Sequence, residues 1–198
     1  MAKTVIYGGT FNPLHVGHAQ IIRLLSEQSF TDELMVIPTA LPPHKEYEGE
    51  VAAEHRLNMC RIAARGLKNV TVSDIELKRQ GKSYTIDTVN ELMQSGKDDI
   101  AVACGGDMLV TLDTWKNYKE LISKVEFIAL YRVGTDKAEF DLCVQKTRDD
   151  GGRVRVIEAD IIDVASKDLR RMLKCGEDTG EYLSPQIIEY IKQNGLYV

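Results

Sequence analysis

The sequence predicts an α/β fold, in which helices cover both faces of a Rossmann-like parallel sheet. Short apolar runs alternate along the chain with segments whose apolar residues recur at helical spacing. Residues 100–104 are apolar throughout, which is typical of a central parallel strand buried on both faces. The chain has 198 residues, enough for one domain with a full core, so we expect a single domain over residues 1–198.

The elements of the first half follow from local patterns. Apolar runs predict strands at 5–7, 35–38 and 70–73. Apolar residues at helical spacing predict helices at 19–28 and 54–64, and Gly66 is a suitable stop for the second helix.

The second half continues the alternation. A helix opens at Ser83 and runs to about residue 94, and the strand at 100–104 follows it. A further strand is expected at 125–131, then a helix at 138–148 and an edge strand at 153–157, where polar and apolar residues alternate. A helix opens at 165–170. Ser184 as N-cap and Pro185 at the first helical position predict a last helix at 186–193.

The composition excludes some classes of partner. The chain is 43% hydrophobic and 28% charged, which is ordinary for a globular protein, and it has a net charge of −5. A general binder of nucleic acid or of a membrane surface would carry a basic face, so neither partner is expected. The oligomeric state is left open, with a homo-oligomer among the alternatives.

The cysteines and the N-terminus predict a cytoplasmic location. Cys60, Cys104, Cys143 and Cys175 lie far apart and form no Cys-x-x-Cys pair, so we expect free thiols in a reducing compartment. We expect no signal peptide, and no apolar run is long enough to span a bilayer.

The stretch from Gly8 to His18 is the strongest functional signal. It joins a strand to a helix, so it places unpaired N–H groups and a positive helix dipole where they can bind phosphate. Gly8 and Gly9 allow close approach, Thr10 adds a hydroxyl, and His15 and His18 add two donors. A His-x-x-His pair can also bind a metal. A zinc site needs further ligands, however, and no other histidine or cysteine is near in sequence, so phosphate is favoured.

The motif Gly-Gly-Thr-Phe-Asn-Pro-x-His-x-Gly-His resembles that of bacterial nicotinate-mononucleotide adenylyltransferases, a branch of the nucleotidyltransferase superfamily. The match continues to residues 182–197, so it spans nearly the full chain. The resemblance implies that ATP and nicotinate mononucleotide react to give deamido-NAD and pyrophosphate. It implies an ATP site that includes Gly8, Gly9, Thr10, Phe11, His15 and His18. It also implies that Asn12 contacts the mononucleotide.

A second segment, Pro42-Pro43-His44-Lys45, ends a loop stiffened by its prolines. From the residues alone, a solvated surface loop is the favoured interpretation. The resemblance implies instead that the segment lies over the active site and reaches both substrates, with Lys45 at a phosphate and His44 at the mononucleotide. Farther along, Met59 is expected to be structural, and the role of Arg56 is left open because an arginine on a helix is usually solvated.

Three residues, Thr85, Trp115 and Lys116, are candidates for binding the nicotinate group of the mononucleotide. The residues alone allow Thr85 to be a helix cap, Trp115 to be a core residue and Lys116 to be solvated. The resemblance implies that Thr85 holds the nicotinate carboxylate, that Trp115 stacks on the pyridine ring, and that the backbone N–H of Lys116 meets the carboxylate. The Lys116 side chain could add positive charge.

The turn Gly105-Gly106-Asp107 follows the central strand, where a carboxylate can accept from ribose hydroxyls. Alone, it is a common turn. The resemblance implies that Gly106 and Asp107 contact the mononucleotide and that Asp107 also contacts ATP.

Ser166 and Arg170 form a second expected anion site, because residues four apart share one face of a helix. The alternative is that Arg170 and Arg171 belong to an ordinary charged face. The resemblance implies contact with the β- and γ-phosphates of ATP. The chain departs from that motif at Ala165, where a hydroxyl is usual, and at Lys167, which puts the ATP affinity or the rate in question.

Catalysis is expected to be positioning and charge stabilisation, with His15, His18, Lys45 and Arg170 as the catalytic residues. Mg²⁺ is expected to be carried by ATP, with no metal site made by the protein. Three alternatives stay open. Nicotinamide mononucleotide or phosphopantetheine could be the acceptor, although the Phe11-Asn12-Pro13 variant argues against the latter. A nucleotide-binding regulatory module with weak turnover is kept open by Ala165.

Overall fold

A sheet of six parallel strands forms the centre of the computed structural model, which describes residues 2–41, 51–132 and 136–198. The strands lie in the order β3-β2-β1-β4-β5-β6. They are β1 Lys3–Gly9, β2 Glu33–Pro38, β3 Val70–Val72, β4 Asp99–Gly105, β5 Glu126–Arg132 and β6 Arg153–Ala159. This order is that of a Rossmann-like doubly wound sheet, which confirms the predicted fold class. The strand expected at 153–157 is at an edge, as its alternating pattern indicated.

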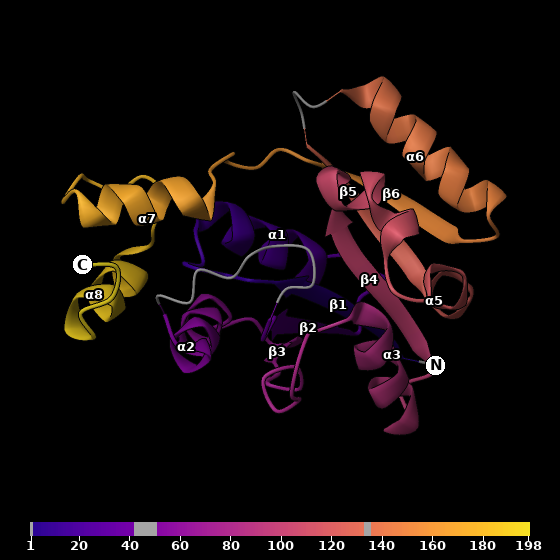
Figure 1. Ribbon diagram of the computed structural model, residues 1–198, viewed down its shortest axis with the longest axis horizontal. Coiled ribbons are helices and arrows are strands. Elements are labelled where there is room, and N and C mark those ends of the chain that lie inside the picture. Colours follow the sequence, from indigo (N-terminus) through magenta and orange to yellow (C-terminus); the bar gives the residue numbers. More distant parts are fainter. Residues whose placement is uncertain (1, 42–50, 133–135) are drawn as a thin grey trace.

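Helices follow the strands along the chain (Figure 1). They are α1 Val16–Ser26, α2 Ala53–Ala63, α3 Thr85–Gln94, α4 Gly106–Val110, the 3₁₀ helix η1 Leu112–Thr114, α5 Tyr118–Lys124, α6 Lys137–Asp149, α7 Ser166–Lys174 and α8 Pro185–Gln193. The three short elements α4, η1 and α5 were not predicted, because segments of three to seven residues are too short to show helical periodicity. Helix α1 begins three residues earlier than predicted, so His18 lies in its first turn.

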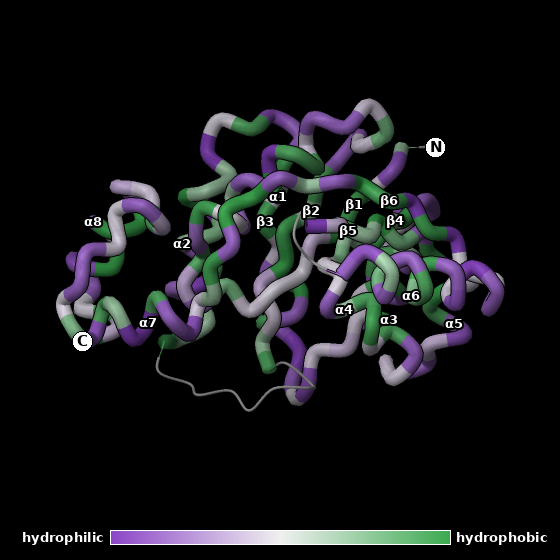
Figure 2. Tube along the Cα trace, turned by 90° about the horizontal axis from the view of Figure 1, so that it is seen from above, coloured by the Kyte–Doolittle hydropathy of each residue, from purple (hydrophilic) through white to green (hydrophobic). Residues whose placement is uncertain are grey.

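Two apolar clusters lie on opposite faces of the sheet because alternate strand residues point to opposite sides. In β1, Val5 and Tyr7 belong to the cluster that includes residues of α1, α2, α7 and α8, whereas Ile6 belongs to the cluster with α3, α5 and α6. Figure 2 shows this layering, with α1 and the group α3 to α6 on opposite sides of the strands. The interior residues of β4 are buried on both faces, as the continuous apolar run predicted.

The switch point of the sheet lies between β1 and β4. The chain leaves β1 for β2 on one side and later returns through β4 on the other, and the two strands pair in parallel from Lys3 opposite Asp99 to Tyr7 opposite Ala103. The following helices α1 and α4 contribute to opposite clusters, so a crevice opens beyond the carboxyl ends of β1 and β4. Gly9 and Gly105 end these two strands.

The cap of α8 and two of the cysteines are as the sequence predicted. Ser184 is the N-cap of α8, and its hydroxyl accepts from the Ile187 N–H at 3.3 Å, as predicted. Cys60 and Cys104 are buried free thiols. None of the helices in the described residues has the length and apolar character needed to cross a bilayer.

Candidate active site

The loop from β1 to α1 takes a compact form around the Phe11 side chain. Phe11 is buried and its φ is +50°, a left-handed conformation that is uncommon for residues other than glycine. Its ring lies edge-on to the rings of Tyr7 and His18, at centroid distances of 5.6 and 5.1 Å. A Cβ atom on Gly9 would lie 2.8 Å from the Phe11 ring, so only glycine fits there. The loop therefore presents backbone, rather than side chains, at the end of β1.

His15 and His18 meet at the N-terminus of α1, as predicted. His15 is the N-cap, and the two rings stack with their centroids 3.6 Å apart. The His15 backbone N–H donates to Nδ1 of His18 at 3.4 Å. Because Nδ1 of His18 accepts, the proton of a neutral His18 ring is assigned to Nε2, which is then a donor.

Both imidazoles are neutral at pH 7. Burial lowers the pKa of His15 from 6.5 to about 4, with a smaller contribution from the Arg132 charge. Burial and the neighbouring His15 hold the pKa of His18 well below its ordinary value. The pair can therefore offer N–H donors but carries no positive charge. Within the described residues, His15 Nδ1 is a buried atom without a hydrogen bond, and such atoms call for a functional explanation.

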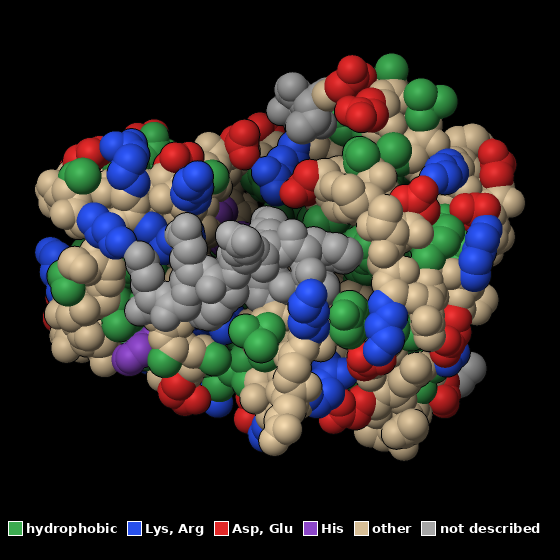
Figure 3. Space-filling model, in the orientation of Figure 1, with side chains coloured by type: hydrophobic (Ala, Val, Ile, Leu, Met, Phe, Trp, Pro, Cys, Tyr) green, Lys and Arg blue, Asp and Glu red, His purple; other side chains and the backbone are tan. Residues whose placement is uncertain are grey.

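Helix α7 packs directly on the first loop. The Ser166 hydroxyl donates to the Pro13 carbonyl at 3.0 Å, and the Arg170 Nη1 donates to the Asn12 carbonyl at 2.9 Å. These two residues share a face of α7, as their spacing predicted. Ala165 is the N-cap and its side chain makes no capping hydrogen bond. Figure 3 shows Lys and Arg side chains gathered over this part of the molecule, beside the central hollow.

Two other contacts hold this arrangement together, and the sequence indicated neither. The Tyr197 hydroxyl donates to Oδ1 of Asn12 at 2.6 Å, so the C-terminal segment fixes a buried Asn12 side chain. A Cβ atom on Gly17 would lie 2.6 Å from the Ile162 carbonyl oxygen, so glycine lets the segment before α7 approach α1.

Arg56, whose role was left open, is fully buried instead of solvated. Its Nη1 donates to the carbonyls of Thr10 at 2.8 Å and Thr39 at 2.7 Å, and its Nη2 donates to Ala40 at 3.4 Å. Arg56 therefore ties the loop after β1 to the segment after β2. Helical periodicity could not reveal this, since it counts every arginine as polar.

Asp107 lies in the first turn of α4, at the carboxyl end of β4. It borders a hollow of about 300 Å³, which is lined by Gly106, Asp107, Val110, Arg132, Asp136, Glu139 and Phe140. A Cβ atom on Gly106 would be 3.1 Å from the Phe140 ring. Arg132, at the end of β5, pairs with Asp163 at 3.1 Å. The turn thus opens onto a hollow in which charged side chains lie beside apolar ones.

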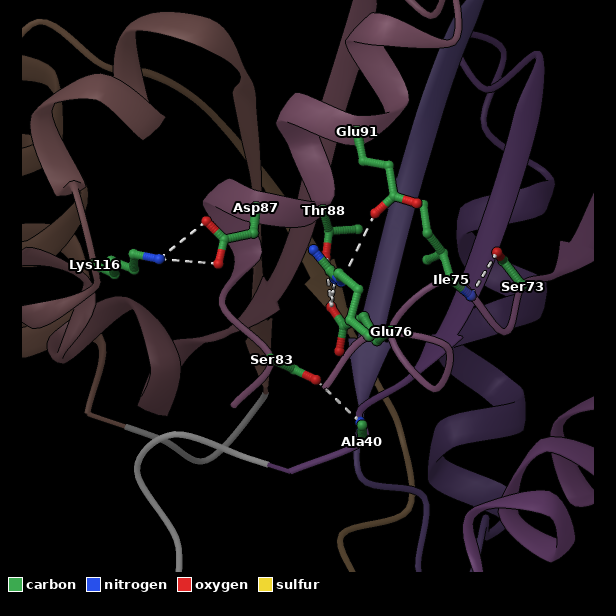
Figure 4. Close-up of polar contacts among 10 residues, drawn as sticks. Ala40, Ser73, Ile75, Glu76, Ser83, Asp87, Thr88, Glu91 and Lys116 are labelled. Atoms are coloured by element: carbon green, nitrogen blue, oxygen red, sulfur yellow. Dashed lines mark hydrogen bonds and ion pairs between the residues drawn. The ribbon is translucent and has the colours of Figure 1, made fainter. Parts of the chain in front are cut away.

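Thr85 is the first residue of α3, and Tyr84 is its N-cap without a side-chain hydrogen bond. The alternative that Thr85 caps this helix is therefore wrong. Asp87 pairs with Lys116, with Nζ 3.0 Å from Oδ2 (Figure 4). The Lys116 Nζ also lies 4.6 Å from the centroid of the Tyr84 ring. The structure thus brings the start of α3 and the Trp115-Lys116 segment together, as the sequence prediction required.

Trp115 is half-buried and meets the Phe127 ring edge-on at 6.5 Å. His44 and Lys45 lie outside the described residues. No group of three or more His, Cys, Asp or Glu side chains in the described part of the chain could hold a metal ion.

A parallel sheet of this order, with a glycine loop and a histidine pair at its switch point, defines a nucleotide-binding α/β protein. The chain belongs to the cytidylyltransferase-like family, whose model matches residues 6–171.

Two relatives match this chain over nearly its full length. A protein of Fusobacterium nucleatum is 33% identical over 193 residues, which cover 96% of this chain and 97% of that protein. A protein of Clostridium acetobutylicum is 34% identical over 202 residues, which cover 100% of this chain and 100% of that protein. Both are named probable nicotinate-nucleotide adenylyltransferase, which confirms the resemblance predicted from the motifs.

A solved structure supports the fold. Plasmodium falciparum nicotinic acid mononucleotide adenylyltransferase, complexed with NaAD, superposes with a TM-score of 0.82 at 19% identity, covering 100% of this chain and 98% of that chain.

Proposed function

We propose that this protein transfers the adenylyl group of ATP to nicotinate mononucleotide and so forms deamido-NAD and pyrophosphate. The observation that carries the proposal is the stacked His15–His18 pair at the N-terminus of α1, beside Ser166 and Arg170 of α7. The names of the full-length relatives support the choice of acceptor.

The reaction needs no activated side-chain nucleophile. A phosphate oxygen of the mononucleotide forms a bond to the α-phosphorus of ATP, and the bond from that phosphorus to the bridging oxygen of pyrophosphate breaks. The negative charge that develops on the phosphate oxygens must be stabilised by fixed donors. The neutral His15 and His18 rings supply N–H donors there, together with the N–H groups of the loop Gly8, Gly9, Thr10 and Phe11.

Ser166, Arg170 and Lys45 act at the leaving pyrophosphate. The guanidinium of Arg170 has five N–H donors, so it can bind a phosphate oxygen while one donor stays on the Asn12 carbonyl. Lys167 is exposed on the first turn of α7 and offers a charge where Ala165 lacks a hydroxyl.

The mononucleotide lies toward α3 and β4 in this proposal. Thr85 and the backbone N–H of Lys116 hold the nicotinate carboxylate, Trp115 stacks on the pyridine ring, and Gly106 and Asp107 contact ribose. Asn12 and His44 complete the mononucleotide site, and Tyr197 holds the Asn12 side chain in one position. Asp107 also contacts the ATP ribose.

Mg²⁺ enters as the ATP complex. Magnesium is usually held by substrate phosphates and water, so it requires few protein ligands. Bound in this way, it would supply positive charge at the departing pyrophosphate. The protein's own contribution is to orient the two substrates so that the attacking oxygen, the α-phosphorus and the leaving oxygen are in line.

The test is release of pyrophosphate from Mg-ATP with nicotinate mononucleotide, run beside nicotinamide mononucleotide. We expect fast release with the acid and little with the amide. Equal rates would keep the reaction and overturn the assigned roles of Thr85 and Trp115. No release with either acceptor would refute the proposed function.

A further inference from the structure

Glu76 is a buried carboxylate that the predicted active site does not use. It lies in the turn between β3 and α3 and is 8% exposed. Burial raises its pKa, while the hydroxyls of Thr88, Ser83 and Thr39 and the charge of Arg79 oppose that rise. A buried carboxylate is costly unless it is hydrogen-bonded, so its surroundings must compensate for it. Those surroundings come from several segments that border the proposed nicotinate site.

On one side, Glu76 is joined to helix α3. The Thr88 hydroxyl, in the first turns of α3, donates to Oε1 of Glu76 at 2.8 Å. Arg79 donates to the Thr88 hydroxyl, and its Nη2 lies 3.8 Å from the same Oε1. Arg79 Nε also lies 3.8 Å from the Glu91 carboxylate on α3. The turn therefore contacts this helix at two positions, Thr88 and Glu91 (Figure 4).

On the other side, Ser83 joins the same region to the segment that follows β2. The Ser83 hydroxyl accepts from the Ala40 N–H at 3.2 Å, and the Ser83 N–H donates to the Leu41 carbonyl at 2.9 Å. Oε2 of Glu76 is a buried atom without a hydrogen-bond partner among the described residues. The Ser83 hydroxyl is near enough to lower the pKa of Glu76. Ser83 precedes Thr85 by two residues.

We propose that Glu76 is a positioning residue for the nicotinate end of the acceptor. It does not touch the substrate. Through the Thr88 hydroxyl it ties the turn after β3 to the start of α3, and therefore to Thr85. Ser83 joins the same region to the strand end at Ala40. The inference rests on the proposed function, in which Thr85 holds the nicotinate carboxylate. Because ATP binds at α1 and α7 instead, loss of Glu76 should affect the two substrates unequally.

The variants Glu76→Gln and Thr88→Val test this role. We expect each to raise the KM for nicotinate mononucleotide about tenfold, since small displacements of a positioned group are costly. The KM for ATP should stay within about twofold, because its proposed site does not depend on this network. Trp115 is the only tryptophan, so its fluorescence during titration with nicotinate mononucleotide gives a binding readout that does not require turnover.

Two controls separate positioning from general damage. Thr88→Ser keeps the hydroxyl and should restore the wild-type KM. Asp74→Asn removes an exposed acid of the same turn, which pairs with Lys78 at 2.9 Å, and should change neither KM. If the wild-type protein is active but Glu76→Gln retains its KM for the mononucleotide, or loses affinity for both substrates equally, the positioning role is refuted. A wild-type protein that releases no pyrophosphate would instead refute the proposed function, and this inference with it.

Discussion

At the scale of single residues, the His15–His18 pair shows how burial sets the chemistry of the site. Desolvation keeps both rings neutral, so in the proposed reaction they act on phosphate as hydrogen-bond donors instead of as cations. A neutral donor does not attract free phosphate or pyrophosphate as strongly as a charged one would. The pair can therefore stabilise charge that develops during transfer and still release the product.

His18→Ala should lower kcat by about 10²–10³, the usual effect of removing one transition-state donor. The fold should persist, because the His18 ring contacts two other rings of the same loop, His15 and Phe11, and lies outside the two apolar clusters of the core. Steady-state pyrophosphate release and thermal melting measure the two effects. His55→Ala, a change on α2 where His55 contacts Tyr190, is the matched control and should leave kcat unchanged. Wild-type turnover in His18→Ala would remove His18 from the mechanism.

The low pKa of His15 also predicts a pH dependence of stability. In the unfolded chain the group binds a proton near pH 6.5, whereas in the folded protein it does so only near pH 4. The contribution of the neutral His15 ring to stability is therefore fully present above about pH 6.5, and it is lost progressively as the pH falls toward 4. From pH 7.5 to 5.5, this one group should lower the free energy of unfolding by about 1 kcal/mol.

Urea unfolding at these two pH values measures that loss in the wild type and in His15→Gln. The variant should lose less stability on acidification, because glutamine does not titrate. His55→Gln is the matched control and should behave as the wild type does. An unchanged pH dependence in His15→Gln would show that other groups cause the effect.

At the scale of elements, α3 and the segment before α5 are joined across the proposed nicotinate site by the Lys116–Asp87 pair. Asp87 neutralises the lysine that lies beside the expected position of the substrate carboxylate. Its own negative charge also opposes binding of that carboxylate. We therefore expect the pair to moderate the preference for the acid over the amide that the proposed function requires.

Asp87→Asn should lower the KM for nicotinate mononucleotide by about two- to fivefold, the range expected for a half-exposed ion pair. The kinetics with nicotinamide mononucleotide should change little, since the amide is neutral at that position. Asp113→Asn is the control, because Asp113 is on η1 but pairs with Lys146 on α6. If both acceptors respond equally to Asp87→Asn, the effect is not one of charge at the carboxylate.

At the scale of the whole molecule, the sequence predicts the features that repeat or that follow a local rule. The apolar run of β4, the cap of α8 and the spacing of Ser166 and Arg170 each gave a correct placement. The short elements α4, η1 and α5 were missed because segments of three to seven residues are too short to show helical periodicity. Contacts between distant segments, such as Tyr197 with Asn12, have no local signal at all.

Arg56 illustrates the same limit, because its environment is created only when β1, β2 and α2 come together. The buried guanidinium donates to three carbonyls, those of Thr10, Thr39 and Ala40. A charged donor satisfies all three at once, and an apolar residue would satisfy none. The arginine thus connects two loops of the proposed active site as well as stabilising the fold.

Arg56→Met should therefore lower the free energy of unfolding by about 3 kcal/mol, since three partly buried carbonyls lose their donor and each such loss costs about 1 kcal/mol. Urea denaturation at pH 7.5 measures the change. Arg61→Met on the same helix is the matched control. Arg61 is half-exposed, and its described contacts are with Glu54 and Asn58 of α2. Its replacement should change the free energy of unfolding by less than about 0.5 kcal/mol. Because Arg56 also holds Thr10 and Thr39, the variant should lose affinity for both substrates. Equal stability of Arg56→Met and Arg61→Met would show that water satisfies these carbonyls when the guanidinium is removed. The hydrogen bonds of Arg56 would then contribute little to the stability of the fold.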